Sequence, residues 1–437
     1  MNALTVALLI FLAGVTVRYL YIIHWHPAED YLYSDMKSYY ASSFRLLNPS
    51  YEEGIRDTIH PPGTQYFFAG LMRLEMWWKG EAYSRKVRPP LNLVMFVQFG
   101  LSALVPLLLA GIASDLWSRR VALWVLGASS LYFPFFDYAG YLLSEAQFLF
   151  FMVLSFWLLV RAIRVKGRLS YVLGASAGIS LGLSASFKTV SLVGAALMLV
   201  LLLVYVKRGA LRAKRAITTS LVGFLVVLSL LAVRATNLSG GFSLIANDAS
   251  RNVLMGHYGT FKRMTFTDSR TNSTYRFGSP AHVQRAYRRT VEIPYGVTQN
   301  RELLELALDW TLQHPAEALS LSVEHVFDLI HTYPWPSIAS PPTRVYAKLF
   351  HYAFHVFLLI PAWVHVLRYR RELLTLQPHM CGDALLIMPL FGIMIAAFIA
   401  IGEARYRVPF DAFTLLLAAR FYCGMRTDEN RLAPGSD

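Results

Sequence analysis

The chain has 437 residues, of which 55% are hydrophobic and only 16% are charged, and its mean hydropathy is +0.41. Soluble chains of this length carry more charge, so this composition excludes a soluble globular protein. The net charge of +14 would suit a nucleic-acid-binding protein, but most of the excess Lys and Arg lies in short clusters between apolar runs. Such clusters mark the cytoplasmic side of membrane proteins, so we expect no nucleic acid partner.

Apolar runs close to the length of a membrane span recur along the whole chain, and they predict an all-α polytopic membrane protein with about ten transmembrane helices. The expected spans are 3–23, 91–114, 121–136, 142–160, 170–187, 190–206, 216–234, 343–367, 383–401 and 407–422. The first run lacks the basic residues and the cleavage site of a signal peptide, so we expect it to be retained. Cys381 and Cys423 are the only cysteines, which excludes a disulfide framework and a cysteine metal cluster.

Four basic clusters predict the orientation in the membrane. They lie at 119–120, 161–168, 207–215 and 368–371, on alternate connections between the expected spans. The positive-inside rule then places both termini in the cytoplasm. We therefore expect a single transmembrane domain, 1–437, in which two long polar loops face the extracytoplasmic side. The first loop is 24–90 and the second loop is 235–342.

The second loop contains two different kinds of sequence. Residues 299–330 have the apolar spacing of helices, and Pro315 suits the first turn of a new helix, so we expect a helical hairpin near the membrane surface. The upstream part, 247–296, is basic and polar. It can bind anionic head groups or an anionic substrate, or it can be an ordinary solvated surface.

Ionisable residues gather near the outer ends of several spans, and the span centres are nearly free of charge. These residues are Arg18, Asp35, Asp137, Glu145, Lys188, Arg234, Glu403, Arg405 and Arg407. Transporters and channels place polar groups at mid-depth, where helices are often broken. A mixed cluster at one boundary favours an enzyme that draws an amphipathic lipid from the outer leaflet, with acids for a hydroxyl nucleophile and bases for a phosphate.

Each of these residues also has a structural interpretation. Lys188 and Arg18 can be anchors whose charged ends reach the membrane surface. Asp137 can cap a turn, and Asp35 can be the N-cap of a helix over MKSYYASSFRLL. His60, before two prolines, can simply begin a helix.

Five motifs in order along the chain carry a resemblance to a known superfamily. They are Ser34-Asp35-Met36 with Tyr39, His60-Pro61-Pro62-Gly63, Leu143-Ser144-Glu145, LGLSASFKTVSLV around Lys188, and GEARYRVPF at 402–410. In this set the sequence resembles the GT-C superfamily of integral-membrane glycosyltransferases. Within it, the nearest branch is the bacterial enzymes related to protein O-mannosyltransferases and to the aminoarabinose transferase of lipid A. The family often has a paired acid in the first loop, whereas Asp35 has no acidic neighbour.

The resemblance implies an inverting glycosyltransferase in the inner (plasma) membrane of a bacterium, with its active site on the extracytoplasmic face. Its donor would be a sugar on a polyprenyl phosphate, and its acceptor a hydroxyl or phosphate on a glycan, lipid or protein. In that scheme Asp35 is the general base, His60 donates a hydrogen bond, and Glu145 binds the acceptor or sugar.

The remaining site residues follow from the same scheme. Arg405 and Lys188 are the best candidates to hold the donor phosphate, with Arg407 and Arg234 behind them. Tyr39, Glu403 and Asp137 are candidates for substrate binding. A divalent cation, Mg²⁺ or Mn²⁺, shared by Asp35 and Glu145 stays open, because members of the superfamily differ in metal dependence.

Two other functions stay open. An O-antigen polymerase or ligase is also a polytopic enzyme with large outer loops, but it uses diphosphate-linked glycans. A transporter or flippase for lipid-linked sugars would move its substrate without breaking a bond, and would call for polar residues at mid-membrane that this sequence lacks.

Overall fold

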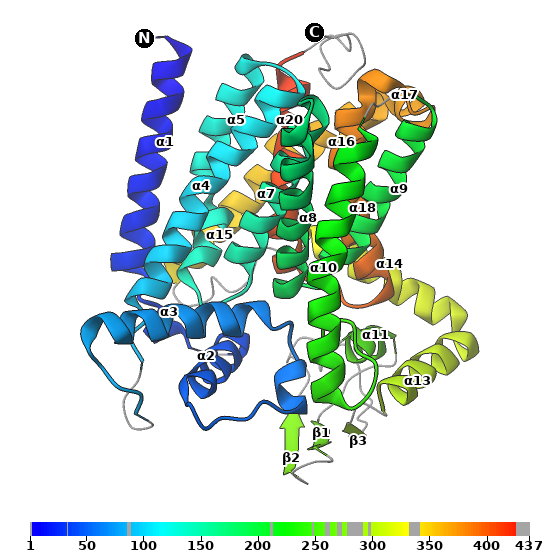
Figure 1. Ribbon diagram of the computed structural model, residues 1–437. Coiled ribbons are helices and arrows are strands. Elements are labelled where there is room, and N and C mark those ends of the chain that lie inside the picture. Colours follow the sequence, from blue (N-terminus) through cyan, green and yellow to red (C-terminus); the bar gives the residue numbers. More distant parts are fainter. Residues whose placement is uncertain are drawn as a thin grey trace.

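The computed structural model describes residues 2–32, 34–84, 89–209, 213–246, 249–257, 263–268, 273–277, 292–295, 299–331 and 341–424. As the sequence predicts, the protein is a polytopic membrane protein of the all-α class, and its bundle consists of helices alone; the described strands all lie in the second loop. Long helices lie side by side, and α2 and α3 lie across one end of the bundle (Figure 1).

The first half of the chain forms helices that alternate between the bundle and the first loop. They are α1 (Ala3–Tyr19), η1 (Leu20–Trp25), η2 (Ala28–Tyr31), α2 (Ser34–Leu47), η3 (Ile55–Thr58), α3 (Gly63–Lys79), α4 (Asn92–Leu116), α5 (Arg119–Leu131), α6 (Phe133–Asp137), η4 (Tyr138–Gly140), α7 (Glu145–Arg164), α8 (Arg168–Phe187), α9 (Ser191–Lys207) and α10 (Lys214–Ser239).

The second half contains the second loop and the last helices of the bundle. Its elements are α11 (Ala249–His257), β1 (Arg263–Asp268), β2 (Ser273–Phe277), β3 (Glu292–Tyr295), α13 (Gln299–Gln313), α14 (Pro315–His331), α15 (Pro341–Phe354), η5 (His355–Leu359), α16 (Ile360–Arg368), α17 (Arg370–Leu374), η6 (Pro378–Met380), α18 (Cys381–Ile399), α19 (Ala404–Arg407), η7 (Val408–Phe410) and α20 (Asp411–Tyr422).

Each apolar segment expected from the sequence corresponds to a helix. Within the described residues, seven helical stretches are long and apolar enough to cross a membrane. They are Ala3–Trp25, Asn92–Leu116, Glu145–Arg164, Arg168–Phe187, Lys214–Ser239, Lys348–Arg368 and Pro378–Ile399. Helix α9 is apolar but shorter, and α5 and α20 have only 13 and 12 residues. These stretches fit an integral membrane protein.

Glycines allow α8 and α10 to pack with their backbones in contact. A Cβ atom at Gly178 of α8 would collide with the backbone carbonyl of Ser220 in α10. At Gly223 of α10, a Cβ would lie 2.5 Å from the carbonyl oxygen of Ala175. Such close approach through small residues is typical of helix pairs in membranes. The contact fixes α8, and with it the residue that follows α8, Lys188.

Arg18 is buried inside the bundle, so its interpretation as an anchor at the membrane surface is wrong. Its guanidinium donates hydrogen bonds to the carbonyl oxygens of Ser130 and Ser129, the second at 2.9 Å, and to that of Gly14 at 3.2 Å. Helix α5 ends at Leu131, where its last carbonyls have no partner within the helix. Arg18 of α1 supplies that partner and joins the two helices.

The second loop contains the predicted helical hairpin, and it also contains a small sheet that the sequence did not predict. Helices α13 and α14 meet at His314 and Pro315, as the sequence predicts. The sheet has the order β2-β1-β3, with β1 antiparallel to β2 and parallel to β3. A position of the hairpin near the membrane surface stays a prediction.

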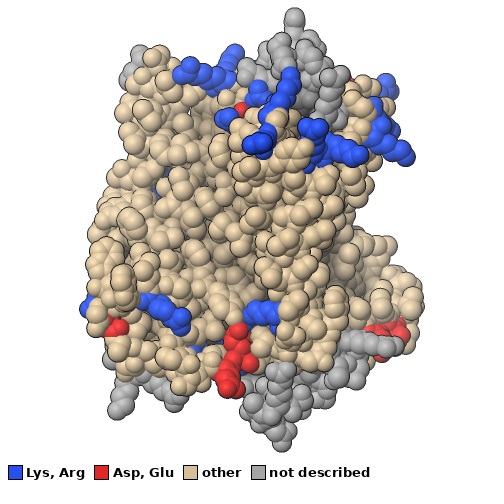
Figure 2. Space-filling model, viewed as in Figure 1, with Lys and Arg blue, Asp and Glu red and all other residues tan. Residues whose placement is uncertain are grey.

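The two ends of the bundle differ in charge. Figure 2 shows Lys and Arg gathered at the upper end, where α5 and α17 begin, whereas acidic and basic residues are mixed near the lower end. We call the upper end the basic end. Helix α1 begins there and α20 ends there, and α2, α3 and α11 lie at the opposite end (Figure 1).

Candidate functional site

A cavity of about 400 Å³ lies at the end of the bundle opposite the basic end. Its charged lining comes from distant parts of the chain: Asp35, Glu145, Lys188, Glu403 and Arg405. Tyr39, His60 and Tyr406 add aromatic rings to the same wall. The apolar part of the lining, which we call the apolar wall, comes mainly from α9, α11 and α18. The cavity therefore combines charged groups with an apolar surface.

Helix ends place the acids and the lysine on this wall. Asp35 lies in the first turn of α2, inside the helix, which begins at Ser34, and not at its cap. Glu145 is the first residue of α7, and Lys188 is the residue directly after α8. The side chain of Lys188 is only 12% exposed, so it is directed into the protein and does not reach toward the membrane surface.

Three ion pairs connect the charged residues. An Nη atom of Arg405 lies 2.7 Å from a carboxylate oxygen of Asp35, and its Nε lies 2.8 Å from a carboxylate oxygen of Glu403. The Nζ of Lys188 lies 2.8 Å from an oxygen of Glu145. The three acids and two bases neutralise most of each other's charge. An anionic ligand could take the place of one of the carboxylates beside Lys188 or Arg405.

The sequence interpretation missed Tyr406, which joins the two cationic centres. Its ring centre lies 4.4 Å from the Nζ of Lys188 and 5.0 Å from the guanidinium carbon of Arg405. Both distances fit cation–π contact. The signal in the sequence was the order Arg-Tyr-Arg at 405–407, in which an aromatic residue lies between two cationic residues.

The charge balance around Asp35 keeps its carboxyl ionised. Burial alone would raise the pKa of Asp35, but Arg405, His60 and Lys188 outweigh burial and hold its pKa well below the usual range. A carboxylate with so low a pKa is a weak base while Arg405 remains beside it. If a bound phosphate took Arg405 away from Asp35, the main cause of this low pKa would be removed.

The His60-Pro61-Pro62-Gly63 corner lies against the end of α8. The ring of His60 lies 5.3 Å from that of Tyr39, centre to centre. A Cβ atom at Gly63 would lie 2.7 Å from the carbonyl oxygen of Ser186, two residues before Lys188. Glycine at 63 therefore lets the corner approach α8 closely, and the prolines restrict the backbone that leads into α3.

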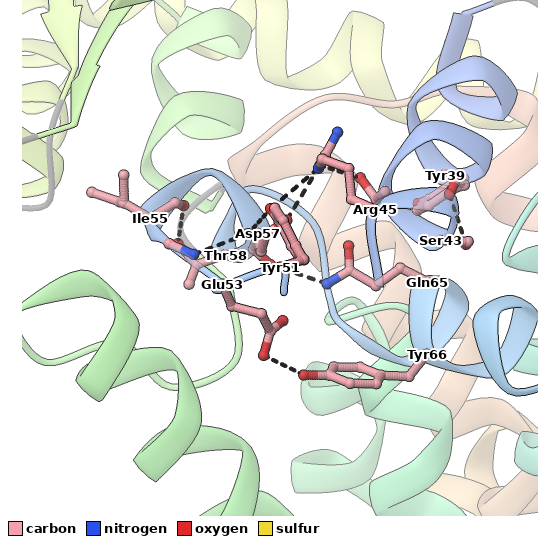
Figure 3. Close-up of polar contacts among 12 residues, drawn as sticks. Tyr39, Ser43, Arg45, Tyr51, Glu53, Ile55, Asp57, Thr58, Gln65 and Tyr66 are labelled. Carbon is pink, nitrogen blue, oxygen red and sulfur yellow. Dashed lines mark hydrogen bonds and ion pairs between the residues drawn. The ribbon is translucent and has the colours of Figure 1, made fainter. Parts of the chain in front are cut away.

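A polar network holds the segment that precedes this corner (Figure 3). Asp57 pairs with Arg45 of α2 at 3.2 Å and accepts a hydrogen bond from the hydroxyl of Tyr51 at 2.6 Å. Its backbone carbonyl accepts a hydrogen bond from Gln65 of α3 at 3.2 Å. Asp57 is buried, and sequence reasoning missed it. It links α2, which carries Asp35, to the corner that carries His60.

Arg407 lies outside the cavity wall, although the sequence analysis places it behind the phosphate-binding pair. It pairs with Asp411 at 3.0 Å and donates hydrogen bonds to the carbonyl oxygens of Leu329 and Ile330 at 3.3 and 2.9 Å. Asp411 also accepts a hydrogen bond from the hydroxyl of Tyr132 at 2.6 Å. Arg407 is therefore a buried connection between α14 and the start of α20.

Arg234 and Asp137 also lie outside the cavity lining. Arg234 of α10 pairs with Glu53 at 2.5 Å and donates to the hydroxyl of Tyr66 at 3.2 Å, so it attaches the first loop to α10. Asp137 is buried and accepts a hydrogen bond from the hydroxyl of Tyr21 at 2.6 Å. Both residues have partners within the protein, and their expected contact with a substrate stays a prediction.

The residues suggested for a divalent cation fit such an ion poorly. In the part of the chain that the structure describes, no three His, Cys, Asp or Glu side chains come together as a metal site. Asp35 and Glu145 both line the cavity, but a cationic side chain already contacts each carboxylate. A cation would have to displace Arg405 and Lys188, so we derive no chemical step through a metal.

Comparison with known proteins gives a fold but no close relative. No protein-family model matches the sequence, and no curated protein matches it. Among solved structures, the archaeal oligosaccharyltransferase AglB from Archaeoglobus fulgidus, in complex with an inhibitory peptide and a dolichol-phosphate, matches with a TM-score of 0.56 and 13% identity. The match covers 96% of this chain and 50% of AglB.

A second structure, of an oligosaccharyltransferase from the same organism in complex with Zn and sulfate, matches with a TM-score of 0.52 and 13% identity, over 95% of this chain and 49% of that chain. The chain therefore shares the fold of the part of these oligosaccharyltransferases that it matches. It spans about half the length of the oligosaccharyltransferase chains that it matches. ArnT from Cupriavidus metallidurans, bound to undecaprenyl phosphate, matches at a TM-score of 0.41 and 13% identity, over 95% of this chain and 77% of ArnT.

Proposed function

We propose that this GT-C-like chain is an inverting glycosyltransferase. It would move a sugar from a polyprenyl-phosphate donor to an acceptor hydroxyl or phosphate at the extracytoplasmic face of the membrane. The observation that carries this proposal is the composition of the cavity. Two cations and three acids of its lining are joined by ion pairs, and the ends of α9 and α18 add an apolar surface to the same cavity. A phosphate joined to a long apolar chain needs both surfaces.

The apolar wall suits the prenyl chain. It includes Leu192 and Val193 near the start of α9, and Ile393, Ala396 and Ala397 near the end of α18. Both helices are apolar and belong to the bundle, so a chain lying along their surface could extend into the hydrocarbon region of the membrane. The dolichol-phosphate bound to AglB is a ligand of this same chemical class.

The charged wall suits the chemistry at the anomeric carbon. Asp35 would accept the proton of the acceptor hydroxyl. At the same time the hydroxyl oxygen would bond to the anomeric carbon from the side opposite the phosphate. The bond between that carbon and the phosphate oxygen breaks, its electron pair stays on the phosphate, and the configuration inverts. Arg405 and Lys188 would stabilise the additional negative charge on the departing polyprenyl phosphate.

The acids beside Asp35 would orient the sugar and the acceptor. Glu145 and Glu403 each pair with a cation, and each can accept hydrogen bonds from sugar hydroxyls. Tyr39 and His60 lie next to one another on the same wall and can contact the sugar ring. Binding of the phosphate by Arg405 would also release Asp35 from its ion pair and make it a stronger base.

The distribution of charge supports an extracytoplasmic site. The basic end of the bundle is the one that the positive-inside rule assigns to the cytoplasm. The cavity lies at the opposite end, with α2, α3 and α11. A donor in the outer leaflet would then present its phosphate at the depth of Lys188 and Arg405.

Donor cleavage in nanodiscs tests the proposal. The purified protein is incubated with matched panels of polyprenyl-monophosphate and polyprenyl-diphosphate sugars and a crude envelope acceptor fraction. The assay measures release of the free polyprenyl phosphate. We expect release from a monophosphate donor by the wild type and by Asp30→Asn, an exposed acid five residues before Asp35. In Asp35→Asn the rate should fall by about 10²- to 10⁴-fold, the usual contribution of a general base.

The same assay separates the alternatives. Full activity of folded Asp35→Asn would rule out Asp35 as the base. Release from diphosphate donors alone would indicate the O-antigen polymerase or ligase reaction. If no donor is cleaved, the protein is placed in sealed vesicles, where movement of a labelled lipid-linked sugar across the membrane without cleavage would indicate the transporter or flippase.

A further inference from the structure

Arg405 lies on a short segment with little secondary structure of its own to hold it. Helix α18 ends at Ile399, and α19, which carries Arg405, has only four residues, Ala404–Arg407. Residues 400–403 between them form no helix or strand. A guanidinium that must meet a phosphate in a defined orientation therefore depends on neighbouring elements for its position.

Two helices of the second loop hold this segment through glycine contacts. A Cβ atom at Gly256, near the end of α11, would collide with the backbone carbonyl of Ala400. A Cβ atom at Gly402 would collide with the carbonyl oxygen of His325 in α14. At both points backbone lies directly on backbone, so the contact is rigid and leaves no room for a side chain.

His325 joins the two glycine contacts. The Nε2 atom of its ring lies 2.9 Å from the carbonyl oxygen of Gly256. Because a carbonyl oxygen can only accept, this nitrogen must carry the proton and donate. The backbone of the same residue supports Gly402. One residue of α14 thus contacts both α11 and the segment before Arg405.

Other contacts strengthen the junction on both sides. The ring of His257 lies 3.2 Å from the hydroxyl of Ser322, which links α11 to α14 a second time. Arg407, two residues after Arg405, donates to carbonyl oxygens at the end of α14. Helix α11 itself lines the cavity with Asn252 and Val253. The junction therefore reaches from the cavity wall to both sides of Arg405.

We propose that the junction of Gly256, His325 and Gly402 positions Arg405 for the donor phosphate, which makes the second loop part of the phosphate-binding site. This inference rests on the proposed function, because it requires that Arg405 contacts the phosphate. His325 touches no substrate in this scheme. It is a positioning residue that acts through Arg405.

The test measures the affinity of the protein in nanodiscs for undecaprenyl phosphate, with and without the Arg405 side chain. We expect His325→Phe, which keeps a ring but loses the donor, to weaken binding by about tenfold, the value of about one hydrogen bond. His325→Gln keeps an N–H donor and should retain most of the affinity. Gly402→Ala should weaken binding, whereas Gly70→Ala, a helical glycine with open space around it, should not.

A double-variant comparison decides whether these residues act through Arg405. In the Arg405→Gln background, His325→Phe should cause no further loss of affinity, because the group that it positions is gone. An equal loss in both backgrounds, or no loss in either, would overturn the positioning role. If Arg405→Gln itself left the affinity unchanged, the proposed phosphate site would fail instead. Should Gly402→Ala not fold, the His325 variants still decide the question.

Discussion

Arg405 and Arg407 are two residues apart on one short helix, yet they lie in opposite surroundings. Arg405 lines the cavity and pairs with Asp35 and Glu403, whose side chains are 27% and 20% exposed. Arg407 pairs with Asp411, whose side chain is fully buried, and binds the end of α14. The first cluster can exchange a carboxylate for a ligand, and the second cannot without unfolding the region around it.

The difference shows that a charged residue near a membrane boundary is not by itself evidence of a site. Arg18, Arg407 and Asp137 lie near the same boundary as Asp35 and Lys188, and all three are sealed by partners inside the protein. Ionised groups can be kept in the interior only when partners compensate for lost hydration. Contact with the cavity that Asp35 and Lys188 line separates the two groups, because Arg18, Arg407 and Asp137 are outside its lining. The predictions below test that separation.

The largest effect on activity is expected at Arg405. In Arg405→Gln the release of polyprenyl phosphate should fall by about 10²- to 10³-fold, because a preorganised donor to the leaving group is lost. The melting temperature should change little, since water can reach the carboxylates that remain. Arg405→Lys keeps the charge but loses the forked geometry, so its rate should be intermediate. If Arg405→Gln instead lost much stability and kept its turnover per folded molecule, Arg405 would be a structural residue like Arg407.

Arg407→Gln should act mainly on stability. It leaves the carboxylate of Asp411 buried without its cationic partner, and we expect the free energy of unfolding to fall by about 3 kcal/mol. Activity per folded molecule should fall much less than in Arg405→Gln. The double variant Arg407→Gln with Asp411→Asn removes the unpaired charge and should recover part of the stability. Thermal unfolding and the release assay, run on the same samples, measure both quantities.

The sequence predicts the depth of a residue in the membrane better than it predicts which way its side chain faces. The apolar runs locate every helix of the bundle, and they place Asp35, Glu145, Lys188 and Arg405 near one boundary, where the structure brings them together. The length of an apolar run fixes where a span ends. The side of a helix that faces a cavity depends on packing against neighbours far away in the sequence. The sequence alone therefore could not show that Arg405 faces the cavity and Arg407 does not.

Irregular connections caused the other misses. Asp57 lies in the short helix η3, and its partners, Arg45 and Tyr51, follow no helical period. The junction of Gly256, His325 and Gly402 joins three segments that are far apart in the sequence. The two glycines are the feature of the sequence that points to close contact there. Close backbone contact requires glycine, but a glycine does not reveal which backbone it meets. Such contacts come from the tertiary structure alone.

The smallest expected effect concerns Asp137, which belongs to the sealed group and lies in α6, outside the candidate spans. Burial raises the pKa of its carboxyl to about 7, although the hydrogen bond from Tyr21 opposes the rise. The ordinary pKa of an aspartic acid is about 3.9. Between these values the folded protein keeps a proton that the unfolded chain has lost. The free energy of unfolding should therefore fall as the pH rises from about 4 to 7.

Two variants check both the sign and the cause of this pH dependence. Asp137→Asn has no proton to lose, so its melting temperature should depend less on pH between 5 and 8 than that of the wild type. Tyr21→Phe removes the hydrogen bond that favours the ionised form, so the loss of stability should continue to a higher pH. Donor cleavage per folded molecule should persist in both, because neither side chain lines the cavity. If Asp137→Asn instead abolished cleavage while remaining folded, Asp137 would move from the sealed group to the site, and contact with the cavity would no longer separate the two.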